Sequence, residues 1–133
     1  MTPRIFLVED NAIVREALTE FILAMGDYDV CGVADSAEDA LEALDSLEVD
    51  LIVADLSLPR MDGSELVERI EERWPGTPCV ICSGHREATY VDRALEAGSR
   101  GYILKGKPGE LKEAIPKILA GELYLSPSLH LSS

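Results

Sequence analysis

Residues 51–63 read LIVADLSLPRMDG, and they combine the signals of a strand, a loop and a helix. Its first part, Leu51–Ala54, is apolar without polar alternation, which is typical of a strand covered on both faces of a parallel sheet. Asp55 stands directly after this run, and a helical pattern begins near Gly63. The stretch therefore predicts a buried strand, a loop that starts with an acidic residue, and a helix, which together are part of a βαβ unit.

The same alternation continues on both sides of this stretch. The apolar runs are Ile5–Val8, Val30–Ala34, Leu51–Ala54, Cys79–Cys82 and Tyr102–Leu104. Amphipathic segments that predict helices lie between and after them: from Asn11 to about Met25, from Ser36, from Gly63 to Trp74, from Glu87 to Ala97 and from Pro108. Because parallel crossovers are right-handed, helices cover both faces of the sheet only if the winding reverses once. We predict an α/β protein with the (βα)5 flavodoxin-like fold and a five-stranded parallel sheet in the order 2-1-3-4-5.

Size and charge restrict the function. The chain has 133 residues, enough for one domain with a core, and its 12 basic and 25 acidic residues give a net charge of −13. Nucleic-acid binding needs a basic surface, so direct binding of nucleic acid is not expected. No apolar run is long enough to span a bilayer, and the start, MTPRIFLVED, lacks the pattern of a signal peptide. We therefore expect a cytoplasmic protein that does not contact the membrane.

Three cysteines, Cys31, Cys79 and Cys82, do not make an even disulfide set. Cys79 and Cys82 form a CxxC pair, but it lies in a strand-like run and has no second pair of ligands, so it is a weak signal for a metal or redox site. We expect all three to be reduced core residues.

Polar residues follow four of the predicted strands. They are Glu9 and Asp10 after the first, Asp55 after the third, Ser83 at the end of the fourth and Lys105 after the fifth. Ligand sites in such sheets lie outside the carboxyl ends of the strands, where the winding reverses. An acid after a strand often caps the next helix, and for Asp10 alone this reading is as good as a functional one. Three adjoining carboxylates, however, repel one another and need a cation, and oxygen ligands suit Mg²⁺.

This set of groups favours phosphoryl chemistry. The Asp55 carboxylate can attack phosphorus and form an aspartyl phosphate. Mg²⁺ and Lys105 would neutralise charge on the transferring oxygens, and Ser83 would donate a hydrogen bond to one of them. A Mg²⁺ phosphohydrolase is an alternative, but it would need a second acid–base group near Asp55, and Leu56 and Ser57 have no carboxylate. A flavodoxin is disfavoured, because acids occupy the loop after the first strand where a phosphate cradle needs Gly, Ser or Thr.

Four segments carry a resemblance to a known family: FLVEDN (6–11), DLSLPRMDG (55–63), Ser83-Gly84 and AGSRGYILK (97–105). Together they resemble the receiver domain of two-component response regulators over about residues 3–124. GYILK and AGELYLSP also resemble the subgroup that precedes LuxR/NarL-type DNA-binding domains. The resemblance implies a receiver domain in residues 1–124 and a tail or the start of a linker in residues 125–133.

The resemblance assigns the phosphoacceptor and the metal ligands. Asp55 would be the phosphoacceptor. Asp10 and Asp55 would ligate Mg²⁺ with the backbone carbonyl of Ser57, and Glu9 would act directly or through water.

The resemblance also implies how phosphorylation is read. Ser83 and Lys105 would sense the phosphoryl group, Tyr102 would be the switch aromatic, and the output surface would be the fourth helix, fifth strand and fifth helix. His85, two residues after Ser83, stands where the family tunes the lifetime of the phosphoryl group. One reading is a solvated loop histidine without a role. In the other reading the ring blocks or orients the attacking water, and of these two we expect it to block the water.

The implied partners are a sensor histidine kinase or phosphotransfer protein, which would donate the phosphoryl group, and a second copy of the chain in a homodimer. The chain would catalyse only its own phosphorylation and dephosphorylation. It would regulate transcription if a DNA-binding domain belongs to the full protein.

The chain departs from the family pattern after the fifth strand. The family has Pro in a cis peptide after the lysine, whereas Gly106 follows Lys105 here, which makes a cis bond costly. Pro116 predicts a kink in the fifth helix.

Overall fold

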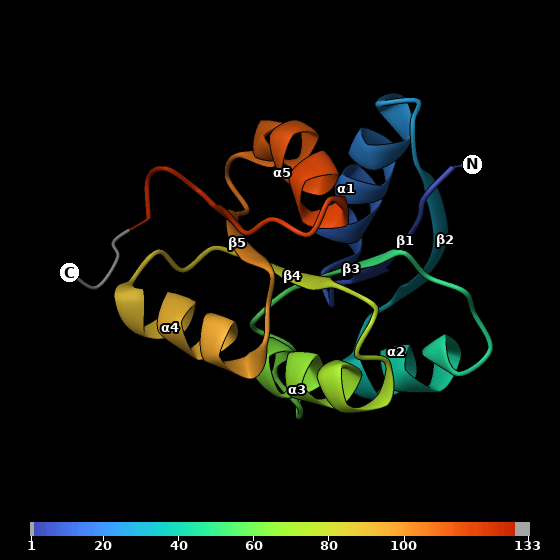
Figure 1. Cartoon of the computed structure of the whole chain (residues 1–133), viewed down its shortest axis with the longest axis horizontal. Coiled ribbons are helices and arrows are strands. Elements are labelled where there is room, and N and C mark those ends of the chain that lie inside the picture. Colours follow the sequence, from blue (N-terminus) through green and yellow to red (C-terminus); the bar gives the residue numbers. More distant parts are fainter. Residues whose placement is uncertain (1, 130–133) are drawn as a thin grey trace.

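The computed structural model describes residues 2–129 and holds a six-stranded parallel sheet (Figure 1). The strands are β1 (Arg4–Val8), β2 (Asp29–Ala34), β3 (Leu51–Ala54), β4 (Cys79–Ser83), β5 (Gly101–Leu104) and β6 (Tyr124–Leu125). The helices are α1 (Ala12–Ala24), α2 (Ala37–Leu44), α3 (Gly63–Arg73), α4 (Ala88–Ala97) and α5 (Leu111–Leu119), with a 3₁₀ turn at Pro108–Glu110. The order of the strands is β2-β1-β3-β4-β5-β6.

Helices cover both faces of the sheet. Figure 1 shows α1 and α5 on one face and α2, α3 and α4 on the other. Successive side chains of a strand point to opposite faces, so Ile52 packs in the core under α2, α3 and α4 while Val53 packs in the core under α1 and α5. This explains why β3 is apolar at every position. None of the helices within residues 2–129 is long and apolar enough to cross a bilayer.

The predicted class and the order of the first five strands are confirmed, and the reversal of winding lies between β1 and β3. The predicted strand count is wrong, because β6 adds to the outer edge of β5, with Gly101 opposite Tyr124 and Tyr102 opposite Leu125. A strand of two residues is too short to leave a periodic pattern in the sequence. The last four residues of the expected tail, 130–133, lie outside the described part.

The helix ends follow their local sequence signals. The side chain of Asn11 accepts hydrogen bonds from the amides of Ile13 and Val14, which makes it the N-cap of α1, where the sequence predicted that helix to begin. Helix α5 continues through Pro116, and the kink there stays a prediction. Within residues 2–129 every peptide bond is trans, including the bond that follows Lys105.

The cysteines are free thiols, as predicted. Cys79 and Cys82 are buried on opposite faces of the sheet, each in a different core cluster, so they do not form a shared metal or redox site. Burial raises the pKa of both thiols, that of Cys82 to about 12, which disfavours the reactive thiolate. Cys31 is only half-buried and corrects the expectation that all three lie in the core.

Candidate functional site

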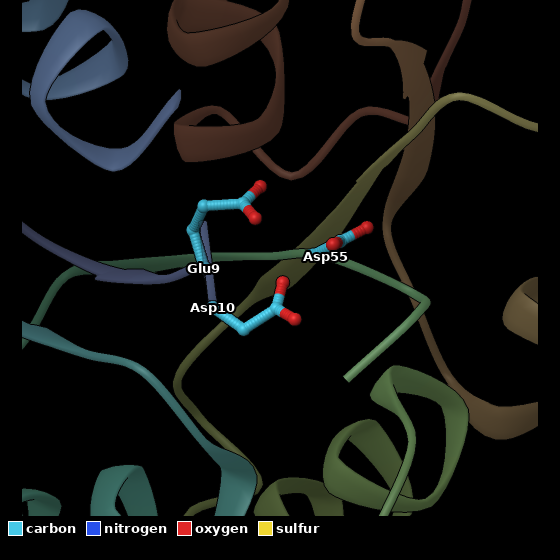
Figure 2. A group of neighbouring side chains, drawn as sticks. All are labelled: Glu9, Asp10 and Asp55. Atoms are coloured by element: carbon cyan, nitrogen blue, oxygen red, sulfur yellow. The ribbon is translucent and has the colours of Figure 1, made fainter. Parts of the chain in front are cut away.

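Three carboxylates meet at the carboxyl ends of β1 and β3, as the sequence predicted. Glu9 and Asp10 follow β1, Asp55 follows β3, and one oxygen of each lies within 4.8 Å of the others (Figure 2). The amide of Asp55 donates to the carbonyl of Val8 at 2.9 Å, which holds the two strand ends together. Because the winding of the chain reverses between β1 and β3, no crossover connection covers this edge of the sheet. A ligand can therefore reach the carboxylates.

Lys105 lies between the two buried acids. Its Nζ is 2.7 Å from Glu9 Oε1 and 2.9 Å from Asp55 Oδ2, and the side chains of Glu9 and Asp55 are only 2% and 4% exposed. Burial raises the pKa of Glu9 above its ordinary value, although Lys105 and the amide of Asn11 oppose this. Burial also acts to lower the pKa of Lys105, but its bonds to the two carboxylates outweigh this effect and raise the pKa. The side chain of Lys105 therefore carries a positive charge at neutral pH.

The donor set fits a divalent cation. Three carboxylates against the one ammonium of Lys105 leave an excess of negative charge when all are ionised, and the oxygens are the hard ligands that Mg²⁺ prefers. The alternative reading of Asp10 as a helix cap is wrong, because Asn11 caps α1. The exposed carboxylate of Asp10 is thus available to an ion.

The loops after β3 and β4 meet beside Asp55. The amide of Ser57 donates to Asp55 Oδ1 at 3.3 Å, and the Ser57 hydroxyl lies 3.2 Å from His85 Nε2. The amide of His85 donates to the hydroxyl of Ser83 at 3.1 Å. Ser57 therefore contacts Asp55 directly, and His85 links Ser57 to Ser83. The predicted role of the Ser57 carbonyl stays a prediction.

Two tyrosines hold the loop that carries His85. Tyr102 is fully buried, and its hydroxyl donates to the carbonyl of His85 at 2.7 Å. The ring of Tyr90, in the first turn of α4, stacks on the His85 ring with 4.2 Å between centroids and 17° between planes. Tyr90 was missed in the sequence, where only its place near the start of the predicted fourth helix connects it with this loop.

Comparisons with known proteins agree with this geometry. Residues 5–116 match the family described as response regulator receiver domain. The chain is 33% identical over 126 residues to the nitrate/nitrite response regulator protein NarL of Escherichia coli (strain K12), covering 94% of this chain and 58% of NarL. A solved two-component response regulator of the LuxR family from Aurantimonas sp. SI85-9A1 superposes with a TM-score of 0.92 at 35% identity, over 97% of this chain and 93% of that one.

The chain spans only part of several relatives. It covers 59% of the transcriptional regulatory protein YdfI of Bacillus subtilis (strain 168), at 31% identity and over 95% of its own length. It is also 42% identical, over 105 residues, to a protein-glutamate methylesterase/protein-glutamine glutaminase 1 of Syntrophus aciditrophicus (strain SB), which covers 77% of this chain but only 30% of that protein. The family match covers residues 5–116, and relatives above 30% identity extend over 94% and 95% of this chain. The chain therefore belongs to the family of response regulator receiver domains.

Proposed function

We propose that the chain is a phosphorylation-controlled switch in which Asp55 accepts a phosphoryl group from a sensor histidine kinase or a phosphotransfer protein. The observation that carries this proposal is the buried Asp55 carboxylate, held 2.9 Å from the ammonium of Lys105 and beside two further acids. An oxygen of Asp55 would attack the phosphorus of a phosphohistidine. The P–O bond forms as the P–N bond breaks, and the electron pair of that bond leaves with the imidazole.

The neighbouring residues have separate roles in this reaction. Glu9, Asp10 and Asp55 would hold Mg²⁺ with the carbonyl of Ser57, and the bound ion would supply positive charge to the phosphoryl oxygens. Lys105 orients Asp55 before transfer and keeps its charge beside the acceptor oxygen afterwards. The Ser83 hydroxyl accepts from the amide of His85, and it would donate its own proton to a phosphoryl oxygen.

The metal part of the proposal predicts that Asp10→Asn lowers the affinity for Mg²⁺ by about tenfold or more, because it removes one of the few anionic oxygens open to the ion. Titration calorimetry of Mg²⁺ into the wild type and the variant measures this. Asp27→Asn is the matched control, because Asp27 is also exposed and precedes β2 at the other end of the sheet. Equal affinities of the wild type and Asp10→Asn would contradict the assignment of Asp10 as a ligand.

The contacts of His85 support a role in the lifetime of the phosphoryl group. Its ring is fixed by the Ser57 hydroxyl on one side and by the Tyr90 ring on the other, next to the loop of the acceptor. We propose that it excludes the water that would hydrolyse the acyl phosphate.

His85→Ala is accordingly expected to speed the loss of phosphoryl from Asp55 by roughly tenfold, which corresponds to about 1.4 kcal/mol of barrier. The decay of the phosphorylated protein after removal of the donor measures it, with the exposed neighbour Arg86→Ala as control. A slower decay in His85→Ala would mean that the imidazole orients the water. An unchanged decay would show that the ring does not meet it.

The output is also part of the proposal. Relatives of this chain include transcriptional regulators and a methylesterase, so membership of the family alone does not choose an output. The segment AGELYLSP, residues 120–127, resembles the subgroup that precedes LuxR/NarL-type DNA-binding domains. We propose control of transcription through a domain outside this chain, in the cytoplasm, where the three free cysteines would stay reduced.

A further inference from the structure

After α5 the chain returns to the sheet as a segment that we call the strap, residues 122–129. Figure 1 shows this segment, in red, passing alongside β5. The amide of Tyr124 donates to the carbonyl of Arg100 at 3.2 Å, and the amide of Ser126 donates to the carbonyl of Tyr102 at 3.0 Å. The strap thus occupies the backbone groups of the β5 edge, which would otherwise be open to another chain.

A buried serine anchors the strap to the end of β5. Ser126 is only 2% exposed, and its hydroxyl accepts a hydrogen bond from the amide of Leu104 at 3.0 Å. The same hydroxyl donates to the carboxylate of Glu110, which also lies 3.4 Å from the Tyr124 hydroxyl. These bonds satisfy the amide of the last residue of β5, which lies past the end of β6, and they join β5, β6 and the turn before α5.

The anchor lies one residue from the proposed phosphoryl-sensing lysine. Leu104, whose amide Ser126 binds, directly precedes Lys105, whose ammonium binds Asp55. Tyr102, whose carbonyl receives the Ser126 amide, also holds the His85 loop through its hydroxyl. Ser126 of the strap, through Leu104, and Asp55, through Lys105, therefore both contact the carboxyl end of β5, and each constrains its position.

We propose that the edge of β5 is an interaction surface whose occupant is the strap, and that phosphorylation of Asp55 strengthens this contact. The inference rests on the proposed function of Asp55. A phosphoryl group adds negative charge beside Lys105 and so fixes the end of β5 in the position that Ser126 also selects. Because coupling between two sites is reciprocal, the strap must in turn favour phosphorylated Asp55. A downstream partner then meets α4, the strap and α5 rather than a bare β5.

The first test uses the wild-type chain with Mg²⁺, with and without beryllofluoride as an analogue of the phosphoryl group. Amide hydrogen exchange at Leu104 and Ser126 is expected to slow by about tenfold when beryllofluoride binds, because local opening of the strap becomes rarer. The amide of Leu104 is the direct reporter, since its partner is the Ser126 side chain. This test does not depend on whether any variant folds.

The second test measures the reciprocal effect. Ser126→Ala should weaken beryllofluoride binding by about fivefold, the lower end of common coupling energies, although the substitution lies outside the acidic pocket. Ser46→Ala is the matched control, because the exposed Ser46 bonds only the carbonyl of Ala43 at the end of α2.

Two results separate the failure of this inference from the failure of the proposed function. If the wild type binds beryllofluoride while exchange at Leu104 and Ser126 is unchanged, the strap is not coupled to the acceptor and the inference is overturned. If the wild type does not bind beryllofluoride with Mg²⁺ at all, the proposed role of Asp55 is wrong and the inference fails with it.

Discussion

Gly63→Ala is expected to destabilise the domain by about 3 kcal/mol or more. An added Cβ at Gly63 would lie 2.2 Å from the carbonyl oxygen of Asp55 and 2.8 Å from Cα of Leu56. Both are backbone atoms that no rotamer change can move. The amide of Gly63 also donates to the carbonyl of Leu56 at 2.8 Å, so the start of α3 is bound where the clash would occur. Helix propensity alone predicts the opposite, a gain of about 1 kcal/mol for alanine in a helix.

Urea denaturation distinguishes these two expectations. Gly76→Ala is the control, because a Cβ at Gly76 meets nothing within 4 Å and its backbone does not require glycine. The midpoint of Gly63→Ala should fall far below those of the wild type and the control. If Gly63→Ala still folds, the displaced Asp55 should accept phosphoryl more slowly. A midpoint equal to that of the wild type would show that the end of β3 and the start of α3 can separate freely.

Asp55→Asn is expected to abolish phosphoryl uptake. The amide of asparagine is not a nucleophile toward phosphorus. The substitution also removes an anionic partner of Lys105. Incorporation of phosphoryl from acetyl phosphate with Mg²⁺ should therefore fall to the background in this variant.

The sheet and the acidic cluster could be predicted from sequence because both depend on local signals. A strand covered on both faces must be apolar throughout, and Leu51–Ala54 has this property. Parallel strands deliver their final residues to one edge, so Glu9, Asp10 and Asp55 had to converge once the order of the strands was known. One choice at this edge could not be made from the sequence. Asp10 and Asn11 both have the chemistry of a helix cap, and only the backbone geometry assigns the cap to Asn11.

The contacts that the sequence did not reveal leave no repeat in residue type along the chain. The bond between Ser126 and Leu104 spans 22 positions and uses a serine in a segment that reads as a loose tail. The stack of Tyr90 on His85 depends on the path of one loop and on two rotamers. Such pairs follow from tertiary packing, which no hydrophobic period records. They involve β5 and the loop after β4, and we propose that they tune the site around Asp55.

The most direct test of the central claim is to locate the phosphoryl group itself. The wild type and Asp55→Asn are incubated with acetyl phosphate and Mg²⁺, and intact mass and peptide mapping are recorded at once. We expect one added phosphoryl group in the wild type, in the peptide that contains Asp55, and none in Asp55→Asn. Equal labelling of the two proteins, or a phosphoryl group on Glu9 or Asp10 in the wild type, would contradict it.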